Sequence, residues 1–275
     1  MLDAKYPILV RGAGDIATGT ARRLHRAGFR VVCTEVAAPL AVRRKVAFSD
    51  AVFDGAAVVE GVDAKLCEPD EISKVLERRL VAVVVDPTAA IRKTMRFAAL
   101  VDARMLKHKP DTTINDAPIV IGLGPGFTAG INCHAFVETL RGHDLGRACY
   151  HGSAAPDTGV PGERGGYTTE RVIRAPDDGE YRAAVKIGDK VDAGEVVAFV
   201  NDTPVRSQIA GIVRGMLRDG LSVAKGLKIG DVDAEAKPEH CVTVSDRANA
   251  IAGGVLEAIL HLVGPAASRK RNLPS

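Results

Sequence analysis

The sequence predicts an α/β protein in which a parallel sheet is followed by a glycine-rich all-β module and a C-terminal helix. Over residues 1–150, short apolar runs alternate with helical patterns, as in strand–helix–strand units. Over residues 170–233 the pattern changes to short alternating runs broken by glycines, and residues 241–263 carry a helical stripe of apolar side chains. We therefore expect three parts with these boundaries. Residues 151–169, rich in glycine, proline, serine and threonine, are expected to form a linker or an active-site lid.

The bulk composition is typical of a globular protein and argues against several kinds of partner. The chain has 275 residues, of which 46% are hydrophobic and 26% charged, and its net charge is only +3. Aromatic residues make up 4% and tryptophan is absent, so a stacking platform for nucleic acid is not expected. No apolar run is long enough to span a membrane. The five cysteines form no Cys-x-x-Cys pair, which favours reduced thiols and a cytoplasmic location, while a homo-oligomer stays open.

A glycine loop near the start of the chain is the main motif. An apolar run over residues 7–11 leads into Gly12 and Gly14, and a helical pattern begins at once. Gly12 suits the tight turn, and Gly14 lets a phosphate approach the backbone and the helix N-terminus. Glu35 ends the next strand about 20 residues further on, where an acid can bind a ribose hydroxyl. The loop residues expected to bind a cofactor are Gly12, Ala13, Gly14, Asp15 and Ile16; the alternative is an ordinary β-turn-α corner without a ligand.

Polar residues and glycines also follow the later predicted strands. Asp86 ends a β-branched run typical of a strand buried on both faces, and Asp102 and Arg104 end another. Together these features predict a Rossmann-like doubly wound sheet, whose ligands bind outside the carboxyl ends of the strands. Arg43 and Arg44 could neutralise an anion there or form a solvated basic turn, and the two aspartates could equally cap the turns that follow. The other residues expected at this edge are Gly124, Gly126 and Thr128.

The predicted β module resembles the barrel-sandwich (biotinyl/lipoyl-like) fold. The phrase Gly-Asp-x-Val-x-x-Gly at residues 188–194 is nearly repeated at residues 219–226. A carrier domain of this type needs a modifiable lysine between its halves, but residues 201–206 contain none, so a structural or docking role is expected. In the last helix Ser245 suits the N-cap. Gly253 and Gly254 would weaken that helix unless another backbone packs against it, from the sheet or from a second subunit.

Potential metal ligands gather in one stretch of the chain. They are Cys133, His134, Glu138, His143 and His151. Their spacing matches no closed zinc pattern, and adjacent strand residues point to opposite faces, so no metal site is expected.

Several segments resemble one family, in the same order. They read VRGAGDIATGTARRLHRAGF, PLAVRRKVAFSDAVFDG, GLGPGFTAG, LRGHDLGR, TGVPG, ERVIRAP, KGLKIGDVD and SDRANAIAGGVLEAIL. Across residues 7–262 the chain resembles the YqeB-like accessory proteins of selenium-dependent molybdenum hydroxylases. The resemblance implies a role in maturing such a hydroxylase, with that enzyme or its maturation factors as partners, and a Rossmann-like N-terminal part. It carries no established catalytic residues; Cys241 and Cys133 are the thiols to test first as sulfur or selenium carriers.

The leading functional hypothesis is an accessory protein that binds a nucleotide-containing ligand, either NAD(P) or a molybdopterin nucleotide, at the sheet edge. Whether any reaction is catalysed stays open. One alternative is an NAD(P)-dependent oxidoreductase, although no Tyr-x-x-x-Lys or comparable acid–base pair follows the glycine loop. The other is a docking module without chemistry, in which residues 170–233 bind a partner enzyme.

Overall fold

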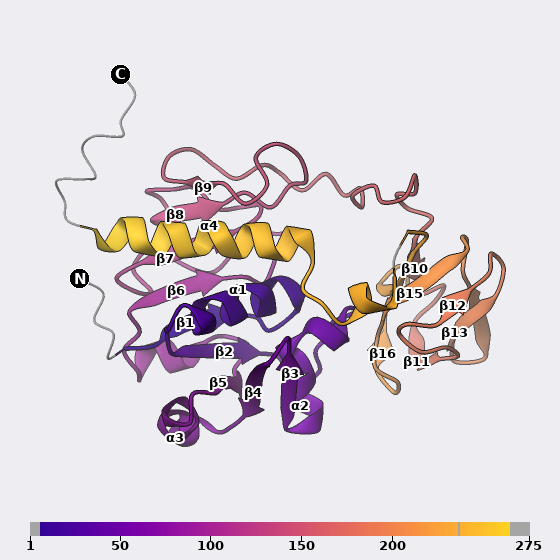
Figure 1. Cartoon of the computed structure of the whole chain (residues 1–275), viewed down its shortest axis with the longest axis horizontal. Coiled ribbons are helices and arrows are strands. Elements are labelled where there is room, and N and C mark those ends of the chain that lie inside the picture. Colours follow the sequence, from indigo (N-terminus) through magenta and orange to yellow (C-terminus); the bar gives the residue numbers. More distant parts are fainter. Residues whose placement is uncertain (1–5, 236, 265–275) are drawn as a thin grey trace.

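A mixed nine-stranded sheet forms the body of the protein (Figure 1). The computed structural model describes residues 6–235 and 237–264. In order across the sheet the strands are β3 (Ala56–Val59), β4 (Val62–Leu66), β5 (Val81–Val85), β2 (Val31–Glu35), β1 (Ile8–Arg11), β6 (Ala99–Asp102), β7 (Val120–Leu123), β8 (Ala135–Val137) and β9 (Ala148–Cys149). Neighbours from β4 to β8 are parallel, whereas the edge strands β3 and β9 are antiparallel to their neighbours. The carboxyl ends of the seven parallel strands therefore share one edge.

Helices cover the two faces of this sheet unequally. The longer helices, α1 (Asp15–Arg26) and α4 (Asp246–Val263), lie side by side on one face (Figure 1). Alternate residues of β1 point to opposite faces, so Ile8 packs in the core beneath α1 and α4 while Leu9 packs in the core beneath α3 (Ile72–Glu77). The remaining helical turns are η1 (Arg44–Val46), η2 (Phe48–Asp50), α2 (Ala51–Asp54), η3 (Pro69–Glu71), η4 (Ala90–Lys93) and η5 (Pro238–Cys241).

The expected doubly wound Rossmann-like architecture is wrong. Such a sheet needs helical crossovers on both faces, because each parallel connection must return over a face and bury it. Between β5 and β6 the chain forms only the short turn η4, and the connections from β6 to β7 and from β7 to β8 are loops in this described part of the chain. Helix α4, contributed from the far end of the sequence, covers β7 and β8 instead.

The β module consists of two four-stranded antiparallel sheets. One contains β10 (Val172–Arg174), β17 (Lys228–Asp233), β15 (Gly211–Met216) and β12 (Lys190–Val191); the other contains β14 (Thr203–Arg206), β13 (Val196–Val200), β11 (Gly179–Ala183) and β16 (Ser222–Val223). Side chains of both sheets, such as Tyr181 and Val213, share one buried core. The expected barrel-sandwich assignment is wrong as well: residues 201–206, expected to connect two halves, form the turn and the second strand of the hairpin β13–β14 within one sheet.

The module sits against the body through residues that precede and include α2. Val42 and Phe53 pack onto the core of the module. The backbone of Val42 also lies close to Gly215: a Cβ on Gly215 would lie 2.7 Å from the Val42 carbonyl oxygen. Arg218 pairs with Asp54, and the Arg218 guanidinium also lies 4.8 Å from the Phe53 ring. None of the helices in the described residues is both long and apolar enough to cross a lipid bilayer.

Local sequence signals explain several element boundaries. The Ser245 hydroxyl accepts a hydrogen bond from the Ala248 amide at 3.1 Å, which confirms the predicted N-cap of α4. Strands β3 and β4 form a hairpin around residues 60 and 61. Glu60 and Gly61 both have positive φ, 44° and 77°, and this two-residue turn reverses the chain.

Candidate functional site

The first glycine loop leaves the N-terminus of α1 open. Gly12 has φ of +99°, its amide donates to the Thr34 carbonyl at 2.8 Å, and its Cα faces the backbone of Arg104. Gly14 is the N-cap of α1, which no side chain caps, and a Cβ at Gly14 would have no other atom within 4 Å. The partial positive charge of a 12-residue helix is therefore exposed where an anion can reach it.

Glu35, at the end of β2, holds this loop in place through hydrogen bonds. One carboxylate oxygen accepts the Ala13 amide at 2.8 Å and the other accepts the Val36 amide at 2.8 Å. Each oxygen has a second lone pair, so the carboxylate can hold the loop and still accept a hydroxyl from a ligand. Asp15 and Ile16 are the first two residues of α1, directly behind the loop.

A charge cluster lies beside the loop, at the carboxyl ends of β1 and β6; Arg11 and Asp102 are buried in it, whereas the side chain of Asp111 is 58% exposed. Arg11 is fully buried, and its guanidinium donates to both carboxylate oxygens of Asp111, at 3.1 and 3.0 Å. Arg104 donates to Asp102 at 3.0 and 2.6 Å and to Asp111 at 2.5 Å. The Thr112 hydroxyl connects the two halves, since it accepts from Arg11 and donates to Asp102, both at 2.6 Å. Two cations and two carboxylates thus neutralise one another beneath the glycine loop.

Ionisation within this cluster follows from these contacts. Partial burial would raise the pKa of Asp111, but hydrogen bonds from Arg11 and Arg104 outweigh it and hold that pKa far below its usual range. For Arg104, burial opposes the charge, yet its hydrogen bonds to Asp102 and Asp111 raise the pKa above its usual value. Asp111 and Arg104 are therefore both charged at neutral pH, and their pairing leaves no free acid or base between them.

A cavity of about 250 Å³ lies at the same edge of the sheet, beyond β6, β7 and β8. Its wall includes Met105, Pro125, Glu138 and Arg247. Glu138 is 9% exposed and its carboxylate accepts three backbone amides, those of residues 139, 140 and 155, at 2.6, 2.7 and 2.9 Å. The full set of lining residues is Met105, Leu106, Lys107, Pro125, Glu138, Thr139, Leu140, Ala155, Pro156, Asp157, Thr158 and Arg247.

Arg247 connects this cavity to the glycine loop. It stands in the first turn of α4, and its Nε donates to the Thr139 carbonyl at 3.1 Å. Burial lowers the pKa of Arg247, and the nearby carboxylate of Asp15 at the start of α1 opposes that shift. The start of α1 and the wall of the cavity are therefore electrostatic neighbours, although they come from opposite ends of the sequence.

The second glycine loop shapes the cavity. Gly124 and Gly126 have φ of +88° and +87°, so both need the freedom of glycine. A Cβ on Gly124 would lie 3.2 Å from the Thr139 hydroxyl, and one on Gly126 would lie 2.8 Å from Pro110. The Thr128 hydroxyl lies 2.8 Å from that of Ser153, which ties this loop to the long segment that follows β9.

Three predicted residues make other contacts. Asp86 accepts the Ile91 amide at 2.9 Å, the capping arrangement that the sequence left open. Arg43 donates to the His240 and Thr243 carbonyls at 2.9 and 3.2 Å. Arg44 donates to the Met216 carbonyl at 3.1 Å and lies 3.8 Å from Asp50. The structure therefore uses both arginines to join the body to the β module and to the segment before α4.

Some residues of the site are not evident from sequence alone. Arg11 carries one available signal, a cation at the end of an otherwise apolar strand, which is unusual unless the charge is paired. Asp111 and Arg247 carry none, because an irregular loop and a distant helix bring them to this edge. No three histidine, cysteine or carboxylate side chains converge within the residues that the structure describes.

The thiols are mostly inaccessible. Cys133 and Cys241 are buried; burial raises the pKa of Cys133 to about 12 and raises that of Cys241 as well. Cys149 is the half-buried cysteine, and burial raises its pKa too. None of these thiols has the electropositive, exposed surroundings of a reactive cysteine.

Comparison with known proteins identifies one clear relative. No protein-family model matches the chain. The uncharacterized protein YqeB of Escherichia coli (strain K12) is 48% identical over 257 residues, which cover 93% of this chain and 48% of YqeB. The YqeB-like part of the predicted resemblance is thereby confirmed, and the chain spans about half the length of that relative.

Solved structures of other proteins are only weakly similar to this chain. An aspartoacylase family protein from Mesorhizobium loti is 10% identical, with 84% of this chain and 87% of that chain covered and a TM-score of 0.28. The ectoine utilization protein EutE (DoeB) from Ruegeria pomeroyi is 10% identical, with 83% and 86% covered and a TM-score of 0.30. At such scores these structures carry no argument about the fold or the activity of this chain; the correction of the predicted Rossmann-like sheet plus barrel-sandwich fold rests on the topology described above. The chain is therefore a relative of YqeB, matched over nearly all of its own length and about half of YqeB's.

Proposed function

We propose that this protein is a cytoplasmic accessory factor that binds a nucleotide-containing anion at the carboxyl edge of the nine-stranded sheet. The observation that carries the proposal is the cavity bounded by Arg247 and Lys107, which lies next to the uncapped N-terminus of α1. A role in maturing a selenium-dependent molybdenum hydroxylase rests on the motif resemblance, and the hydroxylase or its maturation factors are the proposed partners.

The residues at this edge fit the parts of a nucleotide. A phosphate can sit at the start of α1, because Gly14 leaves the backbone open and the helix dipole favours negative charge. Glu35 can accept a ribose hydroxyl with the lone pairs that the loop amides leave. Lys107 and Arg247 can meet further negative charge in the cavity. A cavity of about 250 Å³ holds only part of a dinucleotide or a molybdopterin nucleotide, so the rest would lie along the strand ends.

Binding is tested by thermal shift and calorimetry with NAD, NADP, FAD, CTP and a pterin nucleotide. A ligand at about a hundred times its dissociation constant should add roughly 2.7 kcal/mol of stability. Gly14→Asp places a carboxylate at the open helix start without a steric clash, and Arg247→Gln removes the cavity cation. Each should weaken binding about tenfold or more, whereas Lys190→Gln on the exposed edge of the β module should leave it unchanged. A flat response to the whole panel, or binding that survives Gly14→Asp, contradicts the proposed ligand site.

The accessory role needs a separate measurement in cells. Loss of the protein should lower the activity of the molybdenum hydroxylase without lowering the amount of its polypeptide, and wild type but not Gly14→Asp should restore it. If Gly14→Asp restores activity fully, the glycine loop is dispensable and the docking function of residues 170–233 becomes the better explanation. If loss of the protein does not affect the hydroxylase, the maturation role is wrong.

A further inference from the structure

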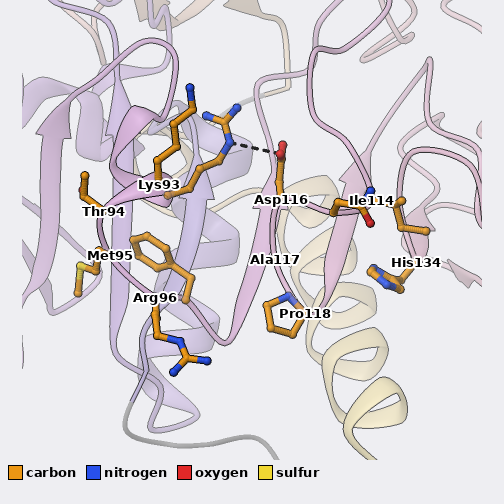
Figure 2. Close-up of a pocket in the computed structure, with 12 residues that line it drawn as sticks. Lys93, Thr94, Met95, Arg96, Ile114, Asp116, Ala117, Pro118 and His134 are labelled. Atoms are coloured by element: carbon orange, nitrogen blue, oxygen red, sulfur yellow. Dashed lines mark ion pairs between the residues drawn. The ribbon is translucent and has the colours of Figure 1, made fainter.

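A second and larger cavity, of about 590 Å³, lies at the opposite edge of the sheet (Figure 2). Its lining residues come directly before three parallel strands: Phe97 before β6, Pro118 before β7 and His134 before β8. The site proposed above lies beyond the other ends of these strands. A strand of four residues spans about 13 Å, so the two cavities are separate sites.

The walls of this cavity are fixed by polar contacts. The Arg92 Nε lies 3.4 Å from Asp116, and its Nη1 donates to the carbonyls of Thr88 and Ala89 at 2.6 and 2.8 Å. The His134 amide donates to the Val120 carbonyl at 2.8 Å, and the Val120 amide donates back to the His134 Nδ1 at 3.0 Å. Because Nδ1 accepts, the proton of this imidazole is on Nε2 and the ring is neutral. The cavity is therefore preformed by three segments that are far apart in the sequence.

The cavity carries unbalanced positive charge. Arg92, Lys93 and Arg96 line it, while Asp116 is the carboxylate among the lining residues and is paired with Arg92. Lys93 and Arg96 have no carboxylate partner within the described part of the chain, and the Arg96 guanidinium lies 5.3 Å from the Tyr6 ring. Figure 2 shows the labelled side chains of Lys93 and Arg96 at opposite ends of the cavity. A negative group could thus be met at either end.

The middle of the cavity is apolar. Phe97 is 6% exposed, and it lines the wall together with Met95, Ile114 and Pro118. An apolar wall between two cationic ends suits a ligand with a flat or aliphatic body and separated acidic groups. A volume of about 590 Å³ is in the range that small organic ligands occupy.

We propose that this cavity binds an elongated organic dianion, with one acidic group near Lys93, the other near Arg96, and an apolar body against Phe97 and Pro118. This site is independent of the nucleotide site proposed above. Its recognition is electrostatic at both ends, so affinity should fall as salt concentration rises.

The test uses naphthalene-2,6-dicarboxylate, whose fluorescence reports binding, with 2-naphthoate and the neutral dimethyl ester as comparison probes. The dicarboxylate should bind the wild-type chain more tightly than either comparison probe. Lys93→Gln and Arg96→Gln should each weaken the dicarboxylate about threefold to tenfold, as expected for a partly exposed charged contact. For 2-naphthoate, which has one acidic group, each substitution should weaken binding less than it weakens the dicarboxylate, because the remaining cation can still bind the carboxylate.

Matched controls lie on the β module. Lys190→Gln removes an exposed lysine. Arg182→Gln removes an arginine that lies 4.4 Å from the Phe199 ring, a matched control for Arg96, which lies 5.3 Å from the Tyr6 ring. Neither should change binding of the dicarboxylate, and Arg247→Gln in the other cavity should not change it either. The proposal is overturned if the dicarboxylate does not bind at millimolar concentration, if the ester binds as well, or if the controls weaken binding as much as Lys93→Gln and Arg96→Gln.

Discussion

Adjacent glycines in α4 should respond in opposite directions to the same substitution. A Cβ on Gly254 would lie 2.1 Å from the carbonyl oxygen of Gly146 and 2.9 Å from Val137. A Cβ on Gly253 would meet only the tip of Arg23, at 3.8 Å. The chain therefore supplies its own control, one residue away in the same helix.

The magnitudes follow from these distances. Gly253→Ala should stabilise the protein by up to about 1 kcal/mol, the helix-propensity difference between the two residues. Gly254→Ala gains the same helix-propensity free energy, but the new Cβ overlaps the Gly146 carbonyl oxygen, so α4 or the turn at Gly146 must move. Overpacking of this type costs about 1–3 kcal/mol. The shift also strains the bond from the Gly146 amide to the Glu138 carbonyl, 2.8 Å long, which contributes about 1 kcal/mol. The two variants should differ by about 2–4 kcal/mol in unfolding free energy.

Urea unfolding followed by circular dichroism measures this difference. The urea midpoint of Gly253→Ala should lie above that of wild type, and the urea midpoint of Gly254→Ala should lie below it. In thermal unfolding, the melting temperatures of the two variants should be about 5–10 °C apart. Equal stability of the two variants would refute the close approach of α4 to the Gly146 turn, and with it the position of α4 on the sheet.

Three further predictions concern charge and thiols. Arg11→Met should lower the unfolding free energy by about 1–3 kcal/mol in the same assay, because the buried Thr112 hydroxyl and the partly exposed Asp111 lose a charged hydrogen-bond donor while Arg104 still pairs with both aspartates; an unchanged unfolding free energy would contradict the charge cluster. Under native conditions at pH 8, a thiol reagent should modify Cys149 slowly and the four buried cysteines only after unfolding, so rapid labelling of two or more thiols would contradict the burial. A hydrogen bond from Arg141 lowers the pKa of Asp246 to about 2 in the folded protein. The ionised Asp246 therefore stabilises the fold fully at pH values above the unfolded pKa of about 3.9, and this stabilisation is lost as the pH falls toward 2. Asp246→Asn should flatten the pH dependence of the melting temperature in that window, and an unchanged acid limb would argue against this ion pair.

Much of the secondary structure was accessible from local patterns. The apolar run before Gly12, the β-branched run before Asp86 and the stripe of the last helix each correspond to an observed element, β1, β5 and α4. Several predicted residues, Asp102 among them, lie at the carboxyl ends of parallel strands, where neighbouring strands end together. Ligand binding at that edge stays a prediction.

The crossovers could not be predicted in this way. Alternation of strands with other segments suggested helices on both faces, but loops of similar length replace them after β5. A loop and a helix can both connect parallel strands, and what decides between them is which other element covers the exposed face. Here α4 covers it on one side, and no local signal reports an element contributed from more than a hundred residues away.

The sequence by itself determined several of the strands and helices, such as β1, β5 and α4, because spacing of apolar residues, the Ser245 cap and the glycine turns act over a few neighbouring residues. Only the tertiary structure decided what those residues do. It placed Arg43 and Arg44 on backbone carbonyls and buried Arg11 against two aspartates. It also brought Arg247 beside the first glycine loop, because long-range packing sets which charges meet and which remain available to a ligand.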